Sequence, residues 1–197
     1  MKSLHVPVSM GAIQVGIFNT LNRTHRIVDG GPNIVTYEGI DLLGKLLAGQ
    51  DININTMYME FTNNPPAPTV TPDPADGRSY YAALDSGLTD LDYIRVPLIS
   101  DPTLEATDDD KFSTNRVNFF AMSTGSTAGR GGHVFSNGAG SQIYGVALVA
   151  APDINDASQD IVFSRSYNFL AKDKQVNEEI SISWSHIFGE NIASSSL

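Results

Sequence analysis

The feature that most constrains the fold is a two-residue alternation of apolar and polar side chains. It is clearest near the end of the chain, in NEEISISWSHIFGEN (177–190), where serines separate the apolar residues. Successive side chains of a β-strand point to opposite faces, so this stretch predicts a strand with one face in a core. The residues predicted to face that core are Ile180, Ile182, Trp184 and Phe188.

Short runs of the same character recur along the chain, and turn residues separate them. They lie at 4–18, 24–28, 55–62, 92–99, 115–122, 142–150, 161–169 and 179–188. Nine or ten short strands without a regular βαβ alternation favour an antiparallel β-sandwich or jelly roll over a doubly wound sheet. A chain of 197 residues suits one domain, so we expect residues 1–197 to form a single mainly β domain.

One segment has helical periodicity instead, at about residues 37–48. Thr36 is placed to cap its first turn, Glu38 lies where a negative charge suits the helix dipole, and Gly49 is placed to end it. We expect this helix to cover one end or face of a sheet. The residues predicted to face the core are Ile40, Leu43 and Leu47.

A proline-rich excursion is expected over residues 62–90. Its segment PPAPTVTPDP (65–74) has five prolines in ten residues, which favour extended chain and cannot donate into a sheet. Long loops usually bind or cover something, although a solvated insertion is the plain alternative. The candidate interface residues are Pro65, Pro66, Pro68, Tyr80 and Tyr81. A short Ser-rich tail at 190–197 has the composition of a disordered end.

The composition excludes several classes of partner and site. The net charge is −10 and no cluster of Lys and Arg exists, which argues against binding nucleic acid or an anionic membrane surface. The absence of cysteine removes disulfides, zinc–thiolate sites and thiol nucleophiles. We see no signal peptide and no apolar stretch of about 18 residues that would span a membrane. Synthesis in a cytoplasm is the expectation.

No motif in the sequence carries a recognisable chemistry. The glycine-rich GSTAGRGG (125–132) lacks the lysine and hydroxyl of a phosphate loop, and the acidic run 108–110 lacks the alternation of a calcium loop. Glu178 and Glu179 are adjacent on a strand, so they point apart, and no GxSxG occurs. His186 lies on the apolar side of 179–188, where a partly buried, hydrogen-bonded histidine at a strand end is expected. We therefore predict no catalytic, cofactor-binding or metal-binding residue, and no enzyme.

Three segments, taken in order, resemble a family of structural proteins of tailed-bacteriophage virions. They are GPNIVTYEGIDLLGKLLAG (31–49), then IYGVALVAA (143–151) with DIVFSRSYNFLAKDK (160–174), then EISISWSHIF (179–188). Together they cover about a third of the chain, and the excursion at 62–90 has no counterpart in the family pattern. The family contains capsid decoration proteins, fibres and tail accessory proteins.

The resemblance implies a non-enzymatic virion protein that binds and stabilises the assembled capsid as a decoration or cement protein. Its expected partners are the major capsid protein or other virion proteins and further copies of itself, with a trimer as the guess by analogy. A tail fibre or baseplate accessory protein that contacts the host surface is the alternative. A small hydrolase of cell-wall sugars is the third reading, although the sequence displays no suitable carboxylate pair.

Overall fold

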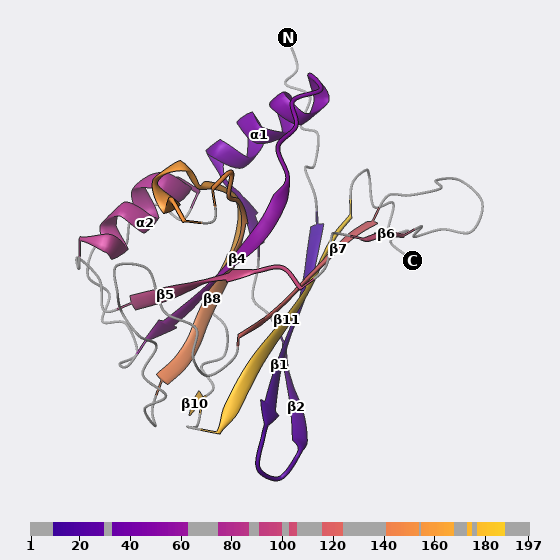
Figure 1. The fold of residues 1–197 in the computed structure, drawn as a ribbon, viewed down its shortest axis with the longest axis vertical. Coiled ribbons are helices and arrows are strands. Elements are labelled where there is room, and N and C mark those ends of the chain that lie inside the picture. Colours follow the sequence, from indigo (N-terminus) through magenta and orange to yellow (C-terminus); the bar gives the residue numbers. More distant parts are fainter. Residues whose placement is uncertain are drawn as a thin grey trace, which may run out of the picture.

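The fold is mainly β, with two antiparallel sheets facing each other and two helices on one side (Figure 1). The structure is a computed structural model. It describes residues 10–29, 33–62, 75–86, 91–99, 103–105, 116–123, 141–153, 155–167, 173–174 and 177–187. The predicted two-sheet, sandwich-like β class is confirmed. The assignment of the whole chain to one domain stays a prediction.

The first sheet has the strand order β2-β1-β11-β7-β6, so the last strand that the structure describes lies at its centre. Its strands are β1 (Met10–Asn19), β2 (Thr24–Asp29), β6 (Thr103–Glu105), β7 (Arg116–Ser123) and β11 (Glu178–Ile187). Both neighbours of β11, β1 and β7, are antiparallel to it. This position explains why so much apolar surface lies near the C-terminus.

The second sheet has the order β3-β9-β8-β4-β5. Its strands are β3 (Asn33–Val35), β4 (Ile54–Thr62), β5 (Leu91–Pro97), β8 (Ser141–Ala150) and β9 (Ile161–Tyr167), and the short β10 (Asp173–Lys174) pairs with β8. A 3-10 turn, η2 (Ala157–Gln159), precedes β9. Residues 56–61 of β4 are all buried, so both faces of this sheet are covered.

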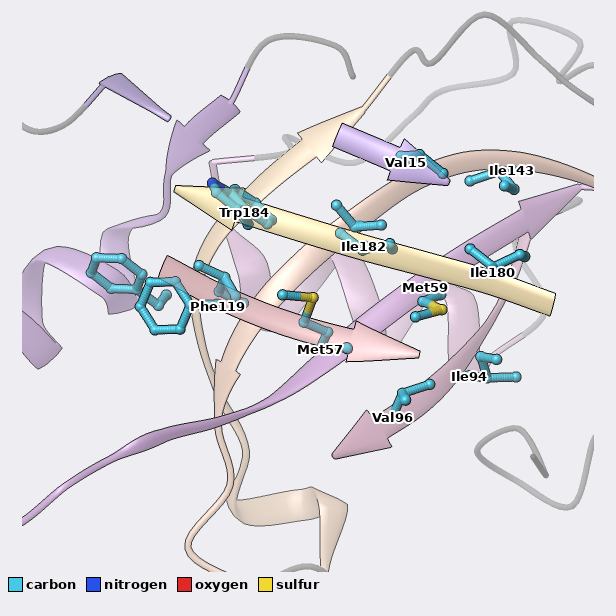
Figure 2. Close-up of a cluster of buried hydrophobic side chains, with 14 of the residues drawn as sticks. Val15, Met57, Met59, Ile94, Val96, Phe119, Ile143, Ile180, Ile182 and Trp184 are labelled. Carbon is cyan, nitrogen blue, oxygen red and sulfur yellow. The ribbon is translucent and has the colours of Figure 1, made fainter. Parts of the chain in front are cut away.

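The main core lies between the sheets, where side chains from both inner faces meet (Figure 2). Ile180, Ile182 and Trp184 of β11 are fully buried there, as the sequence predicts, while Phe188 lies outside the described residues. The other core residues labelled in Figure 2 are Val15, Met57, Met59, Ile94, Val96, Phe119 and Ile143.

The predicted helix is present as α1 (Tyr37–Leu47), and its ends are as expected. The Thr36 side chain accepts a hydrogen bond from the backbone N–H of Gly39 at 2.9 Å, and Gly49 follows the helix with a φ of +80°. These contacts match the usual chemistry of helix caps.

The side of α1 that faces the sheet differs from the prediction. Leu42 is fully buried and Leu43 is half-buried, whereas Ile40 and Leu47 are 54% and 90% exposed. The prediction that Ile40 and Leu47 belong to the core is therefore wrong. The reason is Gly39, whose missing side chain lets α1 approach the backbone of β9 on the side that Gly39 shares with Leu42.

The second half of the predicted excursion is also different, because residues 77–85 form a helix, α2 (Gly77–Asp85). Its Tyr80 and Tyr81 are buried at 1% and 3% exposure, so the prediction that they are interface anchors is wrong. The candidates Pro65, Pro66 and Pro68 and the tail 190–197 lie outside the described residues.

Both helices contact β9 of the second sheet (Figure 1). The tyrosines of α2 pack on the outer face of this sheet, whereas Leu42 of α1 joins the core between the sheets. The two helices are also joined to each other through Glu38 in the first turn of α1. Its carboxylate accepts hydrogen bonds from the backbone N–H groups of Gly77 and Arg78, at 3.1 and 2.8 Å. The Glu38 carboxylate thus interacts favourably with the dipole of α1 and accepts hydrogen bonds from the free N-terminal amides of α2.

Candidate functional site

The most chemically distinctive part of the described structure is a buried polar cluster between the second sheet and α2. Its centre is an ion pair between Glu60 of β4 and Arg165 of β9. These strands are not neighbours, because β8 lies between them. The β8 residues that separate the two side chains are small: Gly145 pairs with Glu60, and Ala147 pairs with Arg165.

Gly145 is required for this arrangement. A Cβ atom at that position would lie 2.9 Å from Oε2 of Glu60 and 2.6 Å from the carbonyl oxygen of Ser166. A glycine within a strand interior often marks a place where other groups approach closely. Here it lets the carboxylate and the guanidinium meet above β8.

The ion pair is bidentate and closed to water. Nε of Arg165 donates to Oε1 of Glu60 at 2.6 Å, and Nη2 donates to Oε2 at 2.5 Å. The side chains are 2% and 0% exposed, respectively. Two parallel charge-assisted hydrogen bonds are the strongest geometry available to this pair, and they offset the cost of taking both charges out of water.

Two tyrosines of α2 complete the coordination of the pair. The hydroxyl of Tyr81 donates to Oε1 of Glu60 at 2.5 Å. The hydroxyl of Tyr80 accepts from Nη2 of Arg165 at 2.6 Å, and it donates to Oε2 at 3.4 Å. The guanidinium carbon also lies 3.8 Å from the centre of the Tyr80 ring, a cation–π geometry. The cluster therefore ties α2 to β4 and β9.

The protonation states of Tyr80, Tyr81 and Arg165 are fixed at neutral pH. Burial, followed by the nearby Glu60 carboxylate, raises the pKa values of both Tyr80 and Tyr81 well above that of free tyrosine. Burial opposes the charge on Arg165, but the adjacent Glu60 carboxylate outweighs it and raises the arginine pKa further. A general acid or base needs a pKa near the working pH, so these three side chains are poorly suited to proton transfer.

A second ion pair flanks the first. Nε of Arg95 donates to Oδ2 of Asp160 at 2.8 Å, and Nη2 donates to Oδ1 at 2.7 Å. The hydroxyl of Tyr58 also donates to Asp160, and that of Tyr93 donates to Asp85 of α2 at 2.8 Å. The rings of Tyr58 and Tyr93 pack with centres 4.9 Å apart. Both pairs join separate elements of the fold, as structural ion pairs do.

A small pocket opens beside the cluster, with a volume of about 100 Å³. Typical small-molecule sites measure about 300–1,000 Å³, so this pocket has room for water or a small ion rather than an organic substrate. Its lining residues are Tyr58, Gly77, Arg78, Tyr81, Ala82, Asp85, Ala157, Ser158, Asp160 and Val162.

His186 is another buried ionisable group, and it lies in the core between the sheets. Its ring stacks on Trp184 at 5.2 Å, and its Nε2 lies 3.3 Å from Oγ of Ser164. Burial lowers the pKa of His186 to about 4, so the ring is neutral at pH 7. The predicted hydrogen bond is present, to Ser164, but the side chain is fully buried rather than partly buried.

Of the cluster, only Tyr80 and Tyr81 were predicted as site residues, and as interface anchors; neither Glu60 nor Arg165 was singled out from the sequence. The sequence did contain a signal for this cluster: Glu60 lies inside the apolar run of β4, and Arg165 lies inside that of β9. Charged residues are rarely found at buried positions unless they are paired. The glycine-rich loop 125–132 and the acidic run 108–110 lie outside the described residues.

Neither the described residues nor comparison with known proteins points to a metal centre or to a relative. In the described part of the chain, no group of three or more His, Asp or Glu side chains could hold a metal ion. None of the helices that the structure describes is both long and apolar enough to cross a membrane. No protein-family model, curated protein or solved structure matches this chain.

Proposed function

We propose that this chain is a non-enzymatic structural protein of a tailed-bacteriophage virion, where it binds and stabilises the assembled capsid as a decoration or cement protein. The observation that carries the proposal is the closed state of the Glu60–Arg165 cluster. Its charges satisfy one another and its tyrosines stay protonated, so its strongest interactions serve the architecture rather than a reaction.

The exposed side of α1 supports a role in protein contact. Tyr37, Ile40 and Leu47 are 61%, 54% and 90% exposed, and they share one side of the helix with Gly44. Interface cores are rich in aromatic and aliphatic residues and poor in charge. We place the contact with the capsid protein on this side of α1.

The mechanism is stabilisation by mass action. A protein that binds across neighbouring capsid subunits binds the assembled shell and not the separated subunits, so its binding free energy favours the shell. A rigid sandwich suits this role because it loses little conformational entropy on binding.

The first experiment locates and counts the protein on purified phage particles, by quantitative mass spectrometry and immunogold labelling. Hundreds of copies on the capsid would support decoration. A handful at the tail would instead favour a fibre or baseplate accessory protein. Absence from particles, or turnover of peptidoglycan by the purified protein, would refute the proposal.

The second experiment tests α1 by co-sedimentation with particles that lack the protein. Ile40→Asp and Leu47→Asp should each weaken binding by at least about tenfold, because each places a carboxylate in an apolar contact. Gln50→Glu adds the same charge beside the helix without changing its apolar side, so it is the matched control. Equal binding by all three variants would show that α1 is not part of the interface.

A further inference from the structure

The described strands leave four sheet edges, and β2 is the longest of them that is regular and free of proline. The strand orders place β2 and β6 at the edges of the first sheet, and β3 and β5 at those of the second. β3 and β6 have only three residues each, and β5 ends at Pro97, after which Leu98 bridges to Ala121 of β7. β2 has six residues and pairs with β1 without a shift in register. Proteins usually protect such an edge with a proline, a bulge or a covering segment.

Both faces of β2 are open to solvent over most of its length. Residues 20–27, which span the turn and the first four residues of β2, are all exposed. Ile27 is 55% exposed on the outer face of the sheet, and the side chain of Arg26 is 45% exposed on the other face. The hairpin of β1 and β2 lies at the opposite end of the molecule from α1 (Figure 1). A strand added to β2 would therefore not displace any element that the structure describes.

The turn that joins β1 to β2 is held in one conformation by hydrogen bonds. Oδ1 of Asn19 accepts from the backbone N–H of Leu21 at 3.0 Å. The backbone N–H of Thr20 donates to the carbonyl oxygen of Asn177 at 2.8 Å, which ties the turn to the residue before β11. Arg23 has a φ of +56°, in the left-handed region. An edge that is already ordered loses little conformational entropy when another strand binds.

The hairpin has the opposite charge balance to the rest of the chain. Residues 20–29 contain two arginines, one histidine and one aspartate, in a chain whose net charge is −10. Arg23 is exposed in the turn, and His25 is exposed on the outer face of β2. The aspartate is Asp29, at the far end of the strand. A ligand on this edge lies within one Debye length, about 8 Å, of the basic residues, and charges farther away are screened.

Two glutamates of β11 lie near the hairpin, but β11 is separated from β2 by β1. Glu178 pairs with Arg26 at 3.2 Å. Glu179 shares the outer face with His25, and Phe18 of β1 lies between them in the register. A partner that approaches the free edge of β2 therefore meets the basic residues first.

We propose that the free edge of β2 binds an extended, acidic segment of another protein, which adds to the five-stranded first sheet as a sixth strand. Backbone hydrogen bonds supply the affinity in this mode of binding, and alternate side chains supply the specificity. His25 and Ile27 share the outer face, so the segment should present a carboxylate there and, two residues away, an apolar side chain. A second copy of the chain is disfavoured, because pairing β2 with β2 would bring two basic hairpins together.

The first test compares two dye-labelled peptides by fluorescence anisotropy. One is the acidic peptide Thr-Glu-Asp-Val-Val-Glu-Thr-Val, and the other has lysine in place of each acidic residue. Protein is added up to about 1 mM, which covers weak and transient contacts. The acidic peptide should bind at least about tenfold more tightly than the basic one. No saturable binding of the acidic peptide, or equal binding of both, would overturn the proposal.

Charge reversal locates the contact on the protein. Arg23→Glu should weaken binding of the acidic peptide at least about threefold, because it replaces an attraction with a repulsion. Lys45→Glu makes the same change on α1, where Lys45 is 39% exposed, and should leave binding unchanged. Thermal unfolding shows whether each variant folds. Equal binding by two folded variants would refute the role of the hairpin.

A second pair of peptides tests whether the backbone of the segment is bound. Both have the acidic sequence, with N-methyl groups on the odd-numbered residues of one and on the even-numbered residues of the other. Only alternate residues of an added strand donate to the edge, so one peptide should lose binding and the other should keep it. Equal binding by both would rule out strand addition.

Hydrogen–deuterium exchange gives a readout that needs no variant. The unmodified acidic peptide should slow exchange in residues 24–29 and leave residues 37–47 of α1 unchanged, and slowing at α1 alone would contradict the assignment. Sedimentation velocity with and without the peptide should give the same number of protein chains per particle. A dimer that the peptide dissociates would show that β2 pairs with a second copy and would overturn the proposal. These measurements use only free protein and synthetic peptides, so their outcome is independent of the proposed function.

Discussion

Replacing Arg165 with methionine should destabilise the protein by about 3–5 kcal/mol, the usual cost of leaving one member of a buried ion pair without its partner. Methionine keeps the length of the side chain and removes the guanidinium. The Glu60 carboxylate then loses both charge-assisted hydrogen bonds, at 2.6 and 2.5 Å, and stays fully buried. Of the hydrogen-bond donors in the cluster, the Glu60 carboxylate then keeps only the hydroxyls of Tyr80 and Tyr81.

The magnitude can be assigned to the pair by a double-mutant cycle. Glu60→Gln alone should cost a similar amount, because it leaves a buried guanidinium without a counter-ion. The double variant should lose at least about 2 kcal/mol less than the sum of the single losses, since no buried charge then lacks a partner. Lys45→Met is the control, because Lys45 pairs with Asp41 at 2.6 Å on the exposed part of α1. Its cost should be below about 0.5 kcal/mol.

The assay is equilibrium unfolding in urea, followed by the fluorescence of the single tryptophan and by circular dichroism. Trp184 is fully buried in the core, so its emission reports loss of the inter-sheet packing. A loss of less than about 1 kcal/mol for Arg165→Met would refute a fully buried ion pair. Additive losses in the double variant would show that the two side chains do not interact.

Three further predictions test other parts of the fold. Trp184→Ala should cost about 3–5 kcal/mol in the same urea assay, and a cost below about 1 kcal/mol would contradict its complete burial. The depressed pKa of His186, about 4, means that its contribution to stability is complete above about pH 6.5 and is lost as the pH falls toward 4. The loss should reach about 3 kcal/mol, and His186→Leu should lack it when pH-dependent unfolding of the two proteins is compared. Gly39→Ala should destabilise by at least about 1–3 kcal/mol, because its Cβ would lie 1.9 Å from the Phe163 carbonyl oxygen, whereas Gly44→Ala, with nothing within 4 Å, should stabilise the protein slightly in thermal melts.

Periodicity predicted the parts of the fold that depend on neighbouring residues in the sequence. The alternation in β11 identified Ile180, Ile182 and Trp184 as core, and all three are fully buried. The cap at Thr36 fixed the start of α1. These features depend on side chains two to four residues apart, and such spacings are visible in one sequence.

The Glu60–Arg165 cluster depends on residues that are far apart along the chain. Glu60 and Arg165 are 105 positions apart, and Arg165 and Tyr80 are 85 apart. Their meeting depends on the strand order, in which β8 lies between β4 and β9, and on the small residue Gly145 at the crossing point. No local pattern encodes a strand order, so a single sequence offered only the unusual charges within apolar runs.

The helix α2 was missed for a different reason. Its nine residues follow a proline-rich stretch, and two of them are tyrosines, which are weak helix formers. A helix this short is marginal without tertiary contacts. Here Asp76 caps it, Glu38 of α1 satisfies two of its N-terminal amides, and its tyrosines bind the ion pair. The contacts that stabilise α2 come mainly from the rest of the fold.

The orientation of α1 shows how a single small residue can decide what a periodic pattern leaves open. Apolar side chains occur around most of the helix, so their spacing alone is compatible with more than one buried side. The side with Gly39 comes closest to the sheet, since only a residue without Cβ fits against the Phe163 carbonyl. That contact buries Leu42 and leaves Ile40 and Leu47 exposed. Burying these two residues against another protein would recover the hydrophobic free energy that folding leaves unused, so the same glycine that fixes the helix on its sheet also selects the side on which we expect a partner to bind.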